Sequence, residues 1–200
     1  AVLKDRLRQL ERQREVRRRA RVRGDVLSVS LVGYTNAGKS TLFNTLTKAG
    51  AYAADQLFAT LDTTSRRLFI ADAGSIVLSD TVGFIRDLPH ALVAAFHATL
   101  EETAQANLLL HVIDAASPDR DQQIRAVDAV LREIGADQVP QILVWNKLDL
   151  TAARPGIERD DCGNISSVRL SARTGAGLPD LRVALAEATS AGKEQSAAAA

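Results

Sequence analysis

The chain has 200 residues, 46% of them hydrophobic, which is enough to bury the core of one domain. Its 25 lysines and arginines nearly balance 24 aspartates and glutamates. The single cysteine, Cys162, excludes a disulfide framework, and we interpret it as a surface thiol. No apolar run approaches the roughly 18 residues of a membrane span, and no apolar segment follows the arginine-rich start as it would in a signal peptide. We therefore expect a cytoplasmic protein. We also expect a monomer.

The charge is divided unevenly along the chain. Residues 1–24 carry ten lysines and arginines against three acidic residues, a net charge of +7, and the remainder carries fifteen against twenty-one, a net charge of −6. The composition of residues 1–24 favours a helix that ends at Gly24. Two interpretations stay open: a solvated helix that has lost a partner helix, or a helix that faces RNA, since clustered arginine is typical of phosphate binding. Because the chain has no methionine and begins at Ala1 within this helix, we expect a fragment.

The next segment has the pattern of a phosphate-binding loop. Residues 26–32 are apolar and β-branched, as in a buried strand, and residues 33–41 match G-x-x-x-x-G-K-S/T at the start of a helix predicted over 39–48. Backbone N–H groups of such a loop point at an anion, and the helix N-terminus adds positive potential. We expect Lys39 to reach the β- and γ-phosphates and the Ser40 hydroxyl to hold Mg²⁺. The predicted phosphate-binding residues are Gly33, Tyr34, Thr35, Asn36, Ala37, Gly38, Lys39, Ser40 and Thr41.

Strands are predicted at 66–71 and 75–80, and their short connection requires an antiparallel hairpin. The second strand runs into a D-x-x-G motif, Asp80-Thr81-Val82-Gly83, all four residues of which we place at the nucleotide. Asp80 is expected to hold Mg²⁺, through water, because Mg²⁺ keeps several waters. The Gly83 N–H is expected to meet the γ-phosphate, since glycine allows close approach.

A helix over 91–105, a strand over 107–113 and a helix over 120–135 follow. His97 lies off the apolar stripe of the first helix, so we interpret it as exposed and not catalytic.

A strand over 140–145 leads into Asn146-Lys147-Leu148-Asp149, an N-K-x-D motif. The Asp149 carboxylate can accept hydrogen bonds from guanine N1–H and the 2-amino group, whereas adenine would leave it unpaired at a cost of about 1–3 kcal/mol or more. The motif therefore favours GTP and disfavours an ATPase. A last strand over 167–171 ends in a short S-A-R loop whose backbone N–H can face guanine O6. The predicted base-binding residues are Asn146, Lys147, Asp149, Ser171, Ala172 and Arg173.

These elements predict an α/β fold, a P-loop GTPase domain with a six-stranded, mostly parallel sheet, one antiparallel edge pair and helices on both faces, preceded by the basic helix. We expect three parts: the helical segment 1–24, the GTPase domain 25–189 with a last helix over 178–189, and a disordered Ala-rich tail 190–200. Residues 151–165 are too irregular for a helix.

Residues 35–42, 57–62 and 80–89 resemble the HflX family of ribosome-associated GTPases, and the resemblance extends from about residue 1 to residue 185. It implies GTP and GDP as ligands, and the large ribosomal subunit and its RNA as partners of the basic helix and the switches. It also implies a domain ahead of the GTPase, which this chain lacks.

The same resemblance implies that Phe58, Ala59 and Thr60 contact the nucleotide, and that Thr60 meets Mg²⁺ once the γ-phosphate orders its loop. Thr63 and Thr64 are rivals for that contact. The family usually has D-P-T after Leu61, whereas this chain has Asp62-Thr63-Thr64, which loosens one turn of the switch.

Catalysis is where the sequence departs from many GTPases, because Phe84 follows D-x-x-G where a water-orienting glutamine often stands. We expect slow intrinsic hydrolysis, stimulated by a partner, with Asn36, Lys39, Thr60 and Gly83 as the catalytic candidates. Surface roles are favoured for Arg66, Arg67 and Arg86. In related N-A-G-K loops the asparagine helps to hold K⁺ beside the phosphates, and Asn36 either does the same or only stabilises its loop. The alternative function is a nucleotide-gated module that docks on RNA or the ribosome, with negligible hydrolysis.

Overall fold

The computed structural model describes residues 26–47, 64–71, 73–81, 83–84 and 97–198. The predicted basic helix and the candidates Phe58, Ala59, Thr60, Thr63, Val82 and Arg86 lie outside these ranges. The predicted helix over 91–105 lies inside them only as α4, His97–Ala104.

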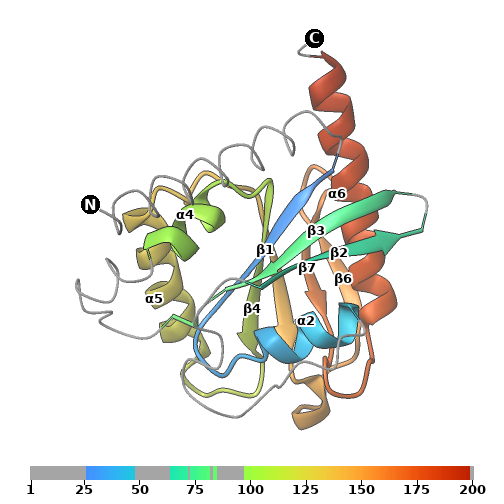
Figure 1. Ribbon diagram of the computed structural model, residues 1–200. Coiled ribbons are helices and arrows are strands. Elements are labelled where there is room, and N and C mark those ends of the chain that lie inside the picture. The colour runs from blue at the N-terminus through green and yellow to red at the C-terminus, as the bar shows by residue number, and fades with distance from the viewer. Residues whose placement is uncertain (1–25, 48–63, 72, 82, 85–96, 199–200) are drawn as a thin grey trace, which may run out of the picture.

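The architecture is a seven-stranded sheet in the order β2-β3-β1-β4-β5-β7-β6 (Figure 1). Strands β3, β1, β4, β5 and β7 are parallel neighbours, and β2 and β6 pair antiparallel with β3 and β7. The strands are β1 Ser28–Val32, β2 Thr64–Ile70, β3 Gly74–Asp80, β4 Leu108–Asp114, β5 Gln141–Asn146, β6 Gly156–Arg159 and β7 Ile165–Arg169. The helices are α2 Lys39–Thr47, α4, α5 Arg120–Glu133, α6 Leu178–Ala198 and a short 3₁₀ turn, η1, Leu148–Leu150.

Two expectations are corrected. The sheet has seven strands and two antiparallel edge pairs, not six strands and one pair. The additional strand is Gly156–Arg159, which lies within the irregular segment 151–165 and pairs with β7. Helix α6 continues to Ala198, so residues 190–198 are helical and not a disordered tail. Alanine has the highest helix propensity, which accounts for the continuation.

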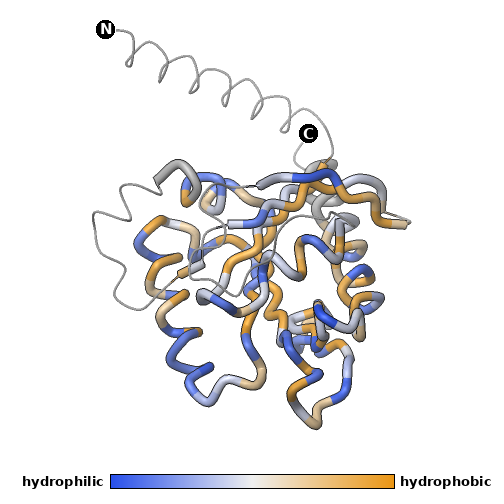
Figure 2. The backbone as a smooth tube through the Cα atoms, turned by 60° about the horizontal axis from the view of Figure 1, so that its bottom comes forward, coloured by the Kyte–Doolittle hydropathy of each residue, from blue (hydrophilic) through white to orange (hydrophobic). Residues whose placement is uncertain are grey.

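The core consists of two layers, one on each face of the sheet. All but the last residue of β4 are buried, as expected for a central strand covered on both sides. On one face α2 and α6 pack through Leu42, Phe43, Leu46, Leu181, Ala184 and Leu185. On the other face α4 and α5 pack through Leu100, Val127, Val130 and Leu131. Figure 2 accordingly shows mostly hydrophobic strands at the centre, with the hydrophilic segments on outer helices and loops.

The strand register brings the predicted motifs to one edge of the sheet. Asp80 is level with Leu31 of β1, two residues before the phosphate-binding loop, and Asp114 is level with Asn146. Because the carboxyl ends of parallel strands share an edge, the loops after β1, β3, β4, β5 and β7 meet there, as in other open α/β sheets. No helix in the described part of the chain is long and apolar enough to cross a membrane.

Candidate functional site

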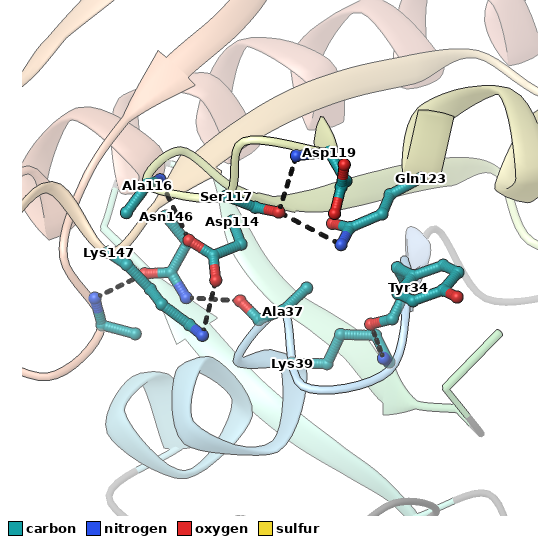
Figure 3. Close-up of polar contacts among 11 residues, drawn as sticks. Tyr34, Ala37, Lys39, Asp114, Ala116, Ser117, Asp119, Gln123, Asn146 and Lys147 are labelled. Atoms are coloured by element: carbon teal, nitrogen blue, oxygen red, sulfur yellow. Dashed lines mark hydrogen bonds and ion pairs between the residues drawn. The ribbon is translucent and has the colours of Figure 1, made fainter. Parts of the chain in front are cut away.

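The loop between β1 and α2 folds around the side chain of Lys39. Its ammonium donates hydrogen bonds to the carbonyl of Gly33, at 3.1 Å, and to that of Tyr34, at 3.0 Å. Figure 3 shows the contact with Tyr34. The residue is only 6% exposed. Burial lowers the pKa of Lys39 to about 8, and the negative charge of Asp80 opposes this shift. The loop therefore presents a buried cation whose charge an anion would stabilise.

One side-chain amide joins three of the predicted motifs. The Nδ2 group of Asn146 donates to Ala37 O at 2.9 Å, and its Oδ1 accepts from Ala172 N–H at 2.9 Å (Figure 3). Gly38 makes this contact feasible, because it has φ +95° and a Cβ there would lie 2.3 Å from the Asn146 amide nitrogen. The N-K-x-D loop thus holds the phosphate-binding loop and the S-A-R loop in fixed relation.

The D-x-x-G segment lies against the same loop. The Ser40 hydroxyl donates to Asp80 Oδ2 at 2.7 Å. Gly83 approaches so closely that a Cβ would lie 2.9 Å from Thr35 Cα. The backbone of Phe84 exchanges hydrogen bonds with this loop, donating to Gly33 O at 3.1 Å and accepting from Thr35 N–H at 2.7 Å.

The paired oxygens of Ser40 and Asp80 suit Mg²⁺, which prefers oxygen ligands and is held by few protein groups plus substrate phosphates. Among the described residues, no cluster of three or more His, Cys, Asp or Glu side chains could hold a metal instead. Thr60, the third predicted ligand, lies outside the described residues.

Of two buried side chains in and after the D-x-x-G motif, only that of Thr81 contributes differently from expectation. The Thr81 hydroxyl is buried and donates to Leu31 O at 2.6 Å, so it braces β1 and does not face a ligand. The Phe84 side chain is fully buried with Val32 and Leu100 in the layer under α4 and α5. It is therefore unable to orient a water molecule, as the sequence indicated.

The base-reading candidates lie at the ends of β5 and β7. Asp149 is exposed, and its Oδ1 accepts a 2.6 Å hydrogen bond from the buried Ser171 hydroxyl, which fixes the carboxylate. Lys147 has φ 64°, a left-handed conformation that costs a non-glycine residue roughly 1–2 kcal/mol. Arg173 is exposed.

Two residues at this edge were not predicted from the sequence. Asp114 Oδ2 pairs with the Lys147 ammonium at 2.8 Å. The Thr45 hydroxyl donates to Ala172 O at 3.1 Å and ties α2 to the S-A-R loop. Asp114 had a signal, because it follows a long apolar run at the carboxyl end of a strand. Thr45 had none, since threonine in a helix usually bonds within it, as Thr45 also does with Thr41 O.

Comparison with known proteins shows the family of this chain. A family model described as 50S ribosome-binding GTPase matches residues 28–147. The chain is 59% identical over 186 residues to the GTPase HflX of Escherichia coli (strain K12), covering 92% of this chain and 44% of that protein. It is 48% identical over 183 residues to the GTPase HflX of Caldanaerobacter subterraneus subsp. tengcongensis, covering 92% and 41%. The chain thus spans less than half the length of these relatives.

Among solved structures, a GTP-binding protein from the archaeon Sulfolobus solfataricus in complex with GDP aligns with a TM-score of 0.64 and 27% identity. The alignment covers 94% of this chain and 58% of that one.

Proposed function

The chain belongs to the HflX family within the 50S ribosome-binding GTPases, and from this premise we propose that it binds GTP and GDP, hydrolyses GTP with Mg²⁺, and acts as a switch on the large ribosomal subunit. The observation that carries the proposal is Asn146, whose amide connects the phosphate-binding loop to the S-A-R loop beside Asp149. A single ligand with a base at one end and phosphates at the other fits that arrangement.

Each end of the ligand has its own protein groups. Backbone N–H groups of the loop 33–41 that are not already bonded within the protein, together with the Lys39 ammonium, bind the phosphates. Ser40 and Asp80 would hold Mg²⁺, which would supply positive charge to the phosphates. Asp149, held by Ser171, accepts two hydrogen bonds from guanine. A backbone N–H of the S-A-R loop meets O6, while the Ala172 N–H stays bonded to Asn146. Thr60 completes the metal site by resemblance to the family.

Hydrolysis by this chain alone is slow, because the buried Phe84 offers no hydrogen bond to water. The candidates that remain are the Gly83 N–H and Lys39 at the γ-phosphate, Thr60 at the metal, and Asn36 with a K⁺ ion. A partner accelerates the reaction. The description of the matching family and the basic segment 1–24 support the large subunit and its RNA as that partner, which implies a cytoplasmic location.

The proposal is tested by equilibrium titration of the chain with GDP, GTP, ATP and XTP. Asp149→Asn should weaken GTP binding and favour XTP, because the amide offers a donor to the 2-keto oxygen, and Lys39→Ala should weaken every triphosphate. Unchanged GTP affinity in Asp149→Asn would remove the base assignment. Sedimentation with large subunits in GTP-analogue, GDP and nucleotide-free states tests the partner, and loss of nucleotide dependence would contradict the switch.

A second function, a nucleotide-gated docking module without useful turnover, is favoured by the burial of Phe84. Single-turnover decay of GTP with and without large subunits separates the two functions. An unchanged, negligible rate with subunits supports the docking module, and a marked acceleration supports the GTPase.

A further inference from the structure

The ion pair between Asp114 and Lys147 joins two parallel strands at the point where both end. Asp114 is the last residue of β4 and lies level with Asn146 of β5, so the following residue, Lys147, turns beside it. Figure 3 shows the two side chains pointing toward one another next to the phosphate-binding loop. Their ammonium and carboxylate oxygen are 2.8 Å apart.

Asp114 is held on both of its oxygens. Oδ1 accepts a 3.0 Å hydrogen bond from the Ala116 N–H, which fixes the turn after β4, and Oδ2 accepts from Lys147. The Ala115 N–H also donates to Asn146 O at 2.9 Å, so the backbones of the two loops are joined directly. The backbone contacts of its loop therefore fix the orientation of the Asp114 carboxylate independently of Lys147.

Lys147 needs such a partner. Its backbone lies in the left-handed region at φ 64°, a conformation that persists only where the surroundings impose it. The two side chains are 24% and 21% exposed, so solvent screens their attraction less than at an open surface. The carboxylate therefore fixes the end of the four-carbon lysine side chain beside β4.

We propose that Asp114 is a positioning residue for guanine-nucleotide binding, which holds the Lys147 ammonium so that the lysine stem lies against the face of the base. The proposal rests on the nucleotide function proposed above and adds to it a residue outside the N-K-x-D motif that acts on base binding through Lys147. Asp149 selects guanine through the hydrogen-bonding groups on the edge of the base. Asp114 instead acts through Lys147 and slows dissociation of the nucleotide, whichever groups that edge carries.

This division predicts different responses to inosine nucleotides, which keep N1–H and lack the 2-amino group. In the full 200-residue chain, Asp114→Asn should raise the dissociation rates of GDP and IDP by the same factor, about tenfold, as expected for loss of a charge-assisted bond. The ratio between the two ligands should stay at its wild-type value, and XDP should gain nothing. Asp149→Asn should instead change that ratio and favour XDP.

A double-mutant cycle tests whether Asp114 acts through Lys147. Lys147→Met keeps most of the stem and removes the ammonium, so Asp114→Asn combined with Lys147→Met should dissociate no faster than Lys147→Met alone. Asp119→Asn is the matched control, because Asp119 is exposed, lies in the same loop, and makes no side-chain cap contact at α5. It should dissociate nucleotide as the wild type does.

Three results would overturn the proposal: dissociation in Asp114→Asn equal to that in Asp119→Asn, additive effects of Asp114→Asn and Lys147→Met, or a changed GDP-to-IDP ratio in Asp114→Asn. If Asp114→Asn lowers the melting temperature of the nucleotide-free chain, Asp114→Glu replaces it. That variant keeps the charge and should stay within about threefold of wild type, and a rate equal to that of Asp114→Asn would also overturn the proposal. Failure of the wild type to bind GDP would overturn the proposed function instead.

Discussion

The hydroxyl of Ser40, in the first turn of α2, donates a 2.7 Å hydrogen bond to Oδ2 of Asp80, the last residue of β3. The two oxygens are separated by 40 positions in sequence and meet only because β1 and β3 are parallel neighbours. The contact places two hard oxygen ligands beside the phosphate-binding loop, where they would hold Mg²⁺.

Removing the Ser40 hydroxyl should weaken Mg²⁺-dependent binding of triphosphate. We expect Ser40→Ala to lose about tenfold or more in GTP affinity, as for a lost contact to a charged group, and chelation of Mg²⁺ to bring the wild type to a similar level. Titration of both proteins with GTP, with Mg²⁺ and with EDTA, measures this. Ser190→Ala, at an exposed position of α6, is the control and should match the wild type. Equal affinities of Ser40→Ala and wild type in Mg²⁺ would contradict the metal assignment.

Nucleotide binding should depend on pH through Lys39. Burial lowers the pKa of Lys39 from 10.5 to about 8. Between pH 8 and pH 10.5 the folded protein therefore binds fewer protons than the unfolded chain, so the contribution of this lysine to stability rises with pH in that range. Phosphates favour the ammonium, so binding above pH 8 should take up a proton and weaken by up to about tenfold per pH unit. Calorimetry of GDP binding at pH 7 and above pH 8, in buffers of different ionisation enthalpy, measures the uptake. Absence of uptake above pH 8 would contradict this role.

Asn36 should decide the response to monovalent ions. It has φ 59°, so its side chain is presented from a left-handed turn of the phosphate-binding loop. We expect steady-state turnover to be low, to rise by about an order of magnitude when K⁺ replaces Na⁺, well below the effect of an arginine finger, and to lose this response in Asn36→Ala.

Asn36→Gly separates the two interpretations of this residue, because glycine adopts the same backbone without strain. If the amide holds the ion, the glycine variant binds GDP normally and lacks the K⁺ response. If the side chain only stabilises the loop, the glycine variant keeps that response. Equal turnover of the wild type in both salts would remove the ion from the mechanism.

The motifs could be predicted from sequence because each follows a strand whose apolar pattern is local. The fold class and the candidate loops followed from these patterns. The edge strand β6 could not be predicted, since Gly156–Arg159 is short, carries exposed charges and is a strand only by pairing with β7. Likewise, the contacts of Asn146 with Ala37 and Ala172 span 109 and 26 positions. Such tertiary contacts have no local sequence signal. The position of Asp114 at the end of a strand was visible in the sequence, but its pairing with Lys147 was not.

Acid should destabilise the fold through His111. This histidine of β4 is 1% exposed, and its Nδ1 has no hydrogen-bond partner among the described residues. Burial, and secondarily the charge of Lys39, lower its pKa from 6.5 to about 4. Because the unfolded chain binds the proton first, stability falls between pH 6.5 and 4, by up to about 3 kcal/mol. Denaturant unfolding of wild type and His111→Gln should show a shallower acid loss in the variant, and parallel curves would contradict it.

The basic segment should control binding to the large subunit. Residues 1–24 carry ten lysines and arginines against three acidic residues, a net charge of +7, attached to a remainder of net charge −6, and this separation exceeds what solubility requires. Neutralised phosphates release counterions, so affinity should fall steeply with salt, with a log–log slope of about −0.7 to −0.9 per phosphate contacted. Deletion of residues 1–24 should largely abolish binding in low salt and flatten the slope.

GTP binding should survive this deletion, because every nucleotide motif follows Gly24. Contacts made by the segment alone should also tolerate changes of RNA sequence, since phosphates carry no base identity. The decisive measurement compares the full chain with the deletion variant across a salt series with the large subunit, with GDP affinity as the control for folding. If both proteins bind the subunit with equal affinity and equal salt slope, the arginines form a solvated face, and the ribosome-facing surface must be sought in the switches.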